Sequence, residues 1–144
     1  MKKIFQIIVL LIIPWTLFAQ KVTYSKDMLN GTEWIMQYSF NTGFNETWIF
    51  AKDEIIMKYS LKNGKTSDLR WSYYLSSTIP TKFDSQKVNT NSSGCYIITN
   101  SKDRQKMISF KIVSLSSNCL KLYWRGDSLA IGGDAMYYNL VRKK

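Results

Sequence analysis

The feature that most constrains the fold is a repeating pattern that begins at Trp34 and continues almost to the C-terminus. Short segments rich in aromatic and β-branched residues alternate with turns of Asn, Gly, Ser, Asp and Lys, at intervals close to the ~8–12 residues typical of β-sandwiches and barrels. Segment 68–75 alternates most regularly, and Asn63-Gly64 before it is the strongest hairpin signal because both residues accept positive φ angles. The sequence therefore predicts an all-β, antiparallel fold with almost no helix.

The predicted strands follow one another through short turns, which is the arrangement of a meander. Eight or nine such strands leave no open sheet edge if they close into an up-and-down barrel. The interior of a barrel of about eight strands holds packed side chains or one small ligand. We therefore expect a single antiparallel up-and-down β-barrel, with a β-sandwich as the alternative. The expected strands are 33–40, 46–50, 54–60, 68–75, 95–99, 107–113, 119–124 and 135–141, with a weak edge strand at 81–88 after Pro80.

The N-terminus predicts export. Two lysines precede an apolar run from Ile4 to Leu17, and Ala19 offers a small residue for cleavage. The run is shorter than the ~20 apolar residues that span a membrane, and Pro14 would disturb a spanning helix. We therefore expect a signal peptide at 1–19 and one β-barrel domain at 20–144, periplasmic or secreted, which does not span the membrane after cleavage.

The charge balance and the absence of histidine limit the classes of function. The formal net charge is +10, and two of the lysines lie in the predicted signal peptide, so the exported chain carries +8. Its lysines are spread singly, which favours an ordinary solvated surface, although positive charge of this size would also suit an acidic partner. Without His the chain has no His-based catalytic triad or zinc site. We expect no catalytic residues, metal, cofactor or nucleic-acid partner.

A helical turn and a tryptophan mark the start of the predicted barrel. Segment 27–30 can form one helical turn that Gly31 ends with a positive φ, and Trp34 follows closely. This opening resembles that of the lipocalin-like (calycin) barrels, especially the compact exported bacterial ones, although the family has one residue between Gly and Trp where this chain has two. The resemblance implies that Trp34 plugs one end of the barrel and that a late Arg covers it. Arg142 is the better-placed candidate and Arg125 the alternative.

Aromatic residues on the predicted inward face are the main indication of function. The resemblance implies a cavity that stacks on an apolar or aromatic ligand, lined by Trp48, Trp71, Tyr73, Phe110 and Trp124. The alternative is that the aromatic side chains, each burying ~150–250 Å², simply fill the barrel. The full set of aromatics predicted to face inward is Trp34, Trp48, Phe50, Tyr59, Trp71, Tyr73, Tyr96, Phe110, Trp124 and Tyr138.

The two cysteines, Cys95 and Cys119, allow two interpretations. A disulfide between them is compatible with an oxidising compartment and would close a loop worth about 3 kcal/mol in the chain-entropy model. However, they begin strands that are next but one in a meander, about twice the ~4.8 Å strand spacing apart, which favours two separate thiols. Neither is expected to be catalytic, because the chain has no His to activate a thiol.

Two functional hypotheses follow from these features. The first is a non-enzymatic, exported, lipocalin-like binding protein that holds a small apolar or aromatic ligand inside the barrel. The second is an interaction or inhibitor module with a solid barrel, which acts through its basic surface and the loops 85–94 and 125–134. The sequence does not identify a protein partner for this module.

Overall fold

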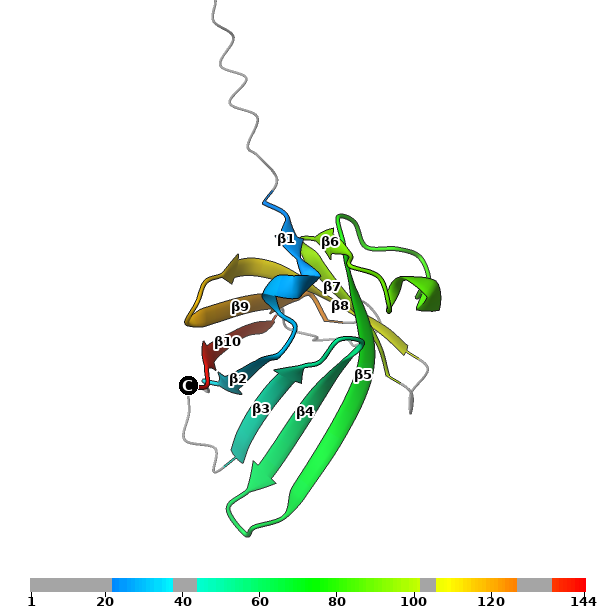
Figure 1. Ribbon diagram of the computed structural model, residues 1–144. Coiled ribbons are helices and arrows are strands. Elements are labelled where there is room, and N and C mark those ends of the chain that lie inside the picture. The colour runs from blue at the N-terminus through cyan, green and yellow to red at the C-terminus, as the bar shows by residue number, and fades with distance from the viewer. Residues whose placement is uncertain (1–21, 38–43, 102–105, 127–135) are drawn as a thin grey trace, which may run out of the picture.

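The computed structural model describes residues 22–37, 44–101, 106–126 and 136–144 (Figure 1). These residues form ten β-strands and two short 3-10 helices, and most of the strands belong to one barrel. The elements are β1 (Tyr24–Ser25), η1 (Lys26–Met28), β2 (Thr32–Met36), β3 (Phe44–Phe50), β4 (Glu54–Leu61), β5 (Thr66–Ser76), η2 (Ser85–Lys87), β6 (Ser93–Gly94), β7 (Tyr96–Ser101), β8 (Lys106–Leu115), β9 (Cys119–Trp124) and β10 (Met136–Arg142).

Eight strands form a closed antiparallel barrel in the order β2-β3-β4-β5-β7-β8-β9-β10, and β10 pairs back with β2. At this closure Leu140 lies opposite Met36 and Arg142 opposite Trp34. Neighbours in the barrel are therefore neighbours in the sequence, apart from the short β6. The predicted up-and-down barrel is confirmed, and the sandwich alternative is wrong. An eight-stranded closed barrel is compatible with a lipocalin-like fold.

Tight turns join β4 to its two neighbours, β5 and β3. Gly64 adopts φ 79°, and the side chain of Asn63 accepts a hydrogen bond of 3.1 Å from the Lys65 amide, which completes the β4–β5 turn. At the other end of β4, the Ala51 amide donates to the Glu54 carbonyl at 2.9 Å. β4 pairs with β3 across the second turn, from Phe50 with Ile55 to Phe44 with Leu61, and with β5 across the first, from Glu54 with Ser72 to Ser60 with Thr66.

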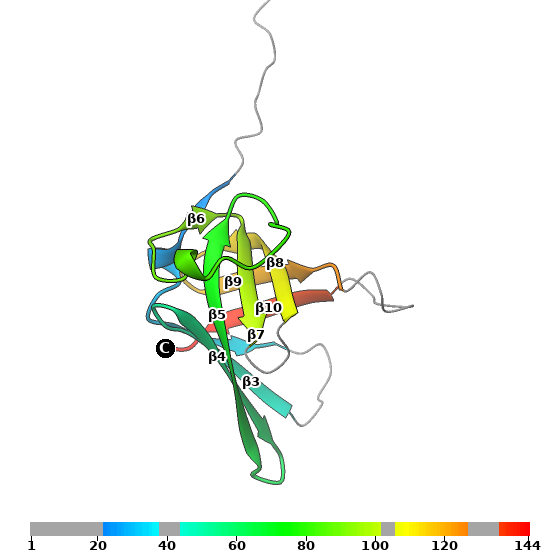
Figure 2. The same cartoon turned by 90° about the vertical axis from the view of Figure 1, so that its right-hand side faces the viewer.

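One end of the barrel is covered by the segment before β2. Figures 1 and 2 show η1 and the paired β1 and β6 at the same end of the molecule, opposite the β4–β5 hairpin. We call this the η1 end. The η1 helix is followed by Leu29, which is fully buried, and by Gly31 at φ 74°. The helical turn and its terminating glycine were predicted, and both are confirmed.

Residue alternation in the strands produces a single core inside the barrel. Nine of the ten aromatics predicted to face inward lie in this core or pack against it, and Tyr96 is the exception. Ile97 pairs with Phe110 and takes the inward position, so its neighbour Tyr96 faces outward. The buried members of the core are Leu29, Trp34, Met36, Trp48, Phe50, Ile55, Met57, Tyr73, Leu75, Ile97, Phe110, Ile112, Leu120, Leu122 and Leu140.

The predicted edge strand at 81–88 is wrong. This segment contains η2, whose N-cap Asp84 accepts a hydrogen bond of 3.1 Å from the Gln86 amide. Val88 and Phe83 pack against Tyr74 and Ile98 on the outer surface of the barrel, where they form a second, smaller apolar cluster. A capped helical turn and this outer contact therefore replace strand pairing in the segment.

Candidate functional site

Three of the five predicted ligand-lining residues meet inside the barrel. The ring centroids of Trp48 and Phe110 are 5.4 Å apart at 76°, and Trp71 stacks on Phe110 at 6.5 Å and 19°. Tyr138 completes the group, with its ring 5.8 Å from Trp48 and 5.6 Å from Phe110. These side chains come from β3, β5, β8 and β10, so they meet across the barrel rather than along one strand. We call Trp48, Trp71, Phe110 and Tyr138 the interior ring cluster.

The two indole N–H groups of the interior ring cluster differ in whether they have a hydrogen-bond acceptor. Trp48 Nε1 donates a hydrogen bond of 2.5 Å to the carboxylate of Glu46, a residue only 6% exposed. In the part of the chain that the structure describes, Trp71 Nε1 is sealed from solvent and has no hydrogen-bond partner. Burial, followed by the negative charge of Glu46, raises the pKa of Tyr138 above its ordinary value. The site thus combines flat apolar rings, a buried carboxylate and one unsatisfied donor.

Sequence reasoning missed Glu46 as part of this site. The residue lies two positions before Trp48 on β3, so both side chains face the interior. A carboxylate at an inward position of a predicted strand is unusual, because burying a charge is costly without a hydrogen-bond donor. That pattern, Glu and Trp separated by one residue, was the available signal.

The other two predicted lining residues lie apart from these contacts. Tyr73 is fully buried, but its ring packs against Phe50 at 5.6 Å and its hydroxyl donates to the Ala51 carbonyl at 3.1 Å. Lys26 Nζ lies 4.6 Å from the centroid of the Tyr73 ring, so Tyr73 belongs to the η1 end. Trp124 packs against the core from the last position of β9 and is partly exposed.

The η1 end contains a buried lysine. Lys26 is 4% exposed, and its ammonium donates to the Val88 carbonyl. Burial lowers the pKa of Lys26, an effect that the nearby charge of Asp53 partly opposes. Burial likewise raises the pKa of Tyr73, with a smaller contribution from Asp53. The hydrogen bond from Lys26 to Val88 thus connects the segment that contains η2 to the η1 end of the barrel.

The three residues predicted to close the barrel lie together at this end. The Gly31 amide donates to the Phe50 carbonyl at 2.8 Å. Trp34 is fully buried and donates from Nε1 to Thr32 Oγ1 at 2.6 Å. The guanidinium of Arg142 lies 5.8 Å from the centroid of the Trp34 ring, while the rest of the Arg142 side chain is exposed. The structure therefore places Arg142, rather than Arg125, over this tryptophan.

Both cysteines are free thiols, with Cys95 buried and Cys119 exposed. The Cys95 carbonyl accepts a hydrogen bond from the amide of Ile112 on β8, whereas Cys119 pairs with Val141 on β10. Cys95 thus adjoins β8 and Cys119 adjoins β10, and no disulfide joins them.

The structure describes one of the two loops of the interaction hypothesis in full and only the start of the other. Segment 85–94 contains η2 and β6, and it packs on the outer surface through Val88. Of segment 125–134, only Arg125 and Gly126 lie within the described residues.

Within the described ranges, we find no helix long and apolar enough to cross a membrane and no group of three or more acidic or cysteine side chains placed to hold a metal ion. Comparisons with protein-family models, with curated proteins and with solved structures found no match to this chain.

Proposed function

We propose that this chain is an exported, non-enzymatic binding protein of lipocalin-like type, which holds a small aromatic or apolar ligand against the interior ring cluster. The observation that carries the proposal is the indole of Trp71, whose Nε1–H is buried and has no hydrogen-bond partner among the described residues, while its ring stacks on Phe110. A buried donor without an acceptor costs about 1–3 kcal/mol, so a ligand that supplies an acceptor would recover that free energy.

The neighbouring indole supports the same interpretation by contrast. Trp48 satisfies its own N–H with Glu46, and that carboxylate is two residues away on the same strand. Trp71 has no such partner within the ranges that the structure describes, although both rings contact Phe110. The ligand expected here is therefore planar and largely apolar, with an acceptor atom at its edge that meets Trp71.

The non-enzymatic role rests on chemistry rather than on the fold. The chain lacks His, and the carboxylate of Glu46 accepts a hydrogen bond from Trp48 Nε1. General acid–base catalysis most often uses His, and glycoside hydrolysis uses a pair of acids. Export follows from residues 1–19, which have the composition of a signal peptide.

Native mass spectrometry of the protein purified from its own exporting host tests the proposal. We expect an additional mass that disappears on denaturation, which would identify the ligand directly. The Trp71→Phe variant keeps the ring against Phe110 but removes the N–H, so the ligand affinity should fall about 5- to 150-fold, the equivalent of 1–3 kcal/mol, and the occupied fraction with it. Tyr137→Phe is the matched control, because it removes one polar group from the outside of the barrel.

Two results would contradict the proposal. One is a clean apoprotein mass for the wild-type protein, and the other is an occupied fraction that Trp71→Phe leaves unchanged.

A further inference from the structure

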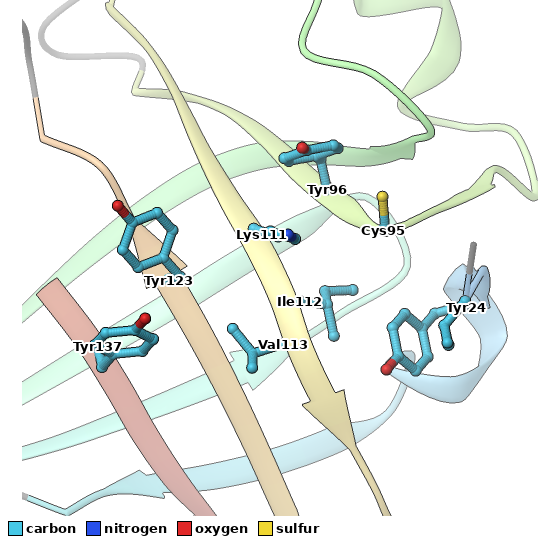
Figure 3. Close-up of a pocket in the computed structure, with 9 residues that line it drawn as sticks. Tyr24, Cys95, Tyr96, Lys111, Ile112, Val113, Tyr123 and Tyr137 are labelled. Atoms are coloured by element: carbon cyan, nitrogen blue, oxygen red, sulfur yellow. The ribbon is translucent and has the colours of Figure 1, made fainter. Parts of the chain in front are cut away.

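A second set of aromatic residues forms a row on the outside of the barrel. Tyr96 on β7 lies opposite Lys111 on β8, which lies opposite Tyr123 on β9, which in turn lies opposite Tyr137 on β10. These four residues are consecutive register partners across four strands, and we call them the outer tyrosine row. Figure 3 shows their side chains on this face, with Val113 beside them.

The outer tyrosine row lines two hollows on the outer surface of the barrel. Two hollows of about 510 and 440 Å³ share Tyr96, Lys111 and Tyr123 as lining residues. The first extends toward Val22 and Tyr137, and the second toward Ile79, Ser109 and Arg125. Both hollows therefore lie along the outer tyrosine row, one on each side of Lys111, and we refer to them together as the groove on the outer face of β7–β10.

The groove is both aromatic and positively charged. Lys111 and Arg125 line it, and Lys121 Nζ lies 5.0 Å from the centroid of the Tyr137 ring. The described residues that line it include no Asp or Glu. Tyr137 is 59% exposed, and its ring lies 5.0 Å from that of Tyr123. A ligand in this groove would therefore meet tyrosine rings, phenolic hydroxyls and cations.

From this geometry we infer that the groove binds a chain of an acidic polysaccharide. The C–H face of a sugar ring packs on an aromatic ring, tyrosine hydroxyls can bond sugar hydroxyls, and Lys111 and Arg125 attract the carboxylate or sulfate groups. Tyr96 and Tyr123 are two strands apart, about 9.6 Å at the usual strand spacing, which is close to the length of a disaccharide. Successive sugars along the polymer could therefore meet successive members of the outer tyrosine row.

A polymer chain fits this surface better than a folded protein does. In the groove, the exposed large apolar side chains of the strands are Tyr137 and Val113, with Val22 and Ile79 at its two limits. Stable protein interfaces bury about 800 Å² on each partner around an apolar centre. Scattered apolar residues with cations around them instead match one extended anionic chain.

The first experiment compares defined polymers with the intact exported protein at low and physiological salt. Polygalacturonate is the probe, dextran is the uncharged polysaccharide control, and poly-L-glutamate and a single-stranded oligonucleotide are anionic controls without pyranose rings. We expect polygalacturonate to bind more tightly than all three controls, with an affinity that falls as salt rises. Equal binding to the anionic polymers, or no binding to polygalacturonate, would overturn the inference.

Variants then locate the site on the barrel. Tyr137→Ala should weaken polygalacturonate binding by roughly three- to tenfold, because it removes one stacking surface. Lys111→Ala should weaken polygalacturonate binding and flatten its salt dependence. The control Lys58→Ala removes one positive charge from an exposed position on β4, three strands away from β8, and should change the affinity by less than about twofold. Similar losses for the two lysine variants would show nonspecific charge attraction and refute the site. The interior variant Trp71→Phe should leave polygalacturonate binding unchanged, so this experiment and that on the interior ligand can fail separately.

Discussion

The tryptophan at the η1 end should contribute far more to stability than the arginine that covers it. Trp34 is fully buried between β3 and β10, and its Nε1–H bonds to Thr32. Arg142 lies over the same ring, but it is an exposed residue near the end of the chain. Substituting each residue alone, and both together, separates burial of the indole from its contact with the cation.

The expected magnitudes follow from these exposures. Trp34→Ala deletes a completely buried indole, so the free energy of unfolding should fall by about 3–5 kcal/mol. Thr32 Oγ1 keeps a hydrogen bond to the Leu29 carbonyl, so the substitution leaves no orphaned hydroxyl to add to that loss. Arg142→Ala removes a cation–π contact at an exposed position and should cost about 0.5–1 kcal/mol, and the double-mutant cycle should return a coupling of the same size.

Urea denaturation followed by far-ultraviolet circular dichroism measures these differences without relying on tryptophan fluorescence. Lys143→Ala is the matched charge control, because Lys143 is an exposed neighbour whose ammonium lies 2.7 Å from the carboxylate of Glu33. We expect that control to cost less than about 1 kcal/mol. A loss above about 2 kcal/mol for Arg142→Ala, or below about 1 kcal/mol for Trp34→Ala, would refute this assignment of the stabilising energy.

Three further predictions concern the backbone, a thiol and pH. Gly94→Ala should destabilise the protein by at least about 1–3 kcal/mol in the same assay, because the added Cβ would lie 2.0 Å from the carbonyl carbon of Ser76, the last residue of β5. Gly31→Ala places its Cβ in open space, so it should cost only about 1 kcal/mol, for the positive φ. In the native protein Ellman's reagent should titrate one thiol, that of Cys119, and a second only after unfolding. Thermal stability should decrease as pH rises above about 10, because the raised pKa of Tyr73 means that its phenol loses a proton in the unfolded chain before it does so in the folded protein. Lys26 has a lowered pKa, so its ammonium loses a proton first in the folded protein, and this opposes the decrease only up to about the unfolded pKa of 10.5.

The sequence predicted the elements whose signals are local. Asn63-Gly64 specifies its turn through the positive φ of Gly64 and the hydrogen bond that the Asn63 side chain accepts, and Gly31 ends the helical turn by its own positive φ. The segment at 81–88 was predicted wrongly because its contact with Tyr74 and Ile98 is tertiary. No property of a short, weakly alternating segment shows that it will cover the outside of a distant pair of strands.

The composition of the interior site was less predictable than the fold. Alternation indicates which side chains face inward, but it does not show which rings meet, since that depends on the register between strands. The register shift between Ile112 and Ser114 on β8 is an example, because it follows from pairing with β9 and has no signature in the sequence. The contacts of Phe110 with Trp48 and Trp71 therefore emerged only from the assembled barrel.

The strand period also explains why one small barrel can offer two separate surfaces. Phe110 and Tyr138 belong to the interior ring cluster, while their immediate neighbours, Lys111 and Tyr137, belong to the outer tyrosine row. Successive side chains of a strand point to opposite faces, so the two surfaces share strands but no side chains. A one-residue shift in the pairing of β10 would exchange its inward and outward tyrosines and damage both surfaces together. Single substitutions that preserve the register can therefore disable one surface and leave the other intact.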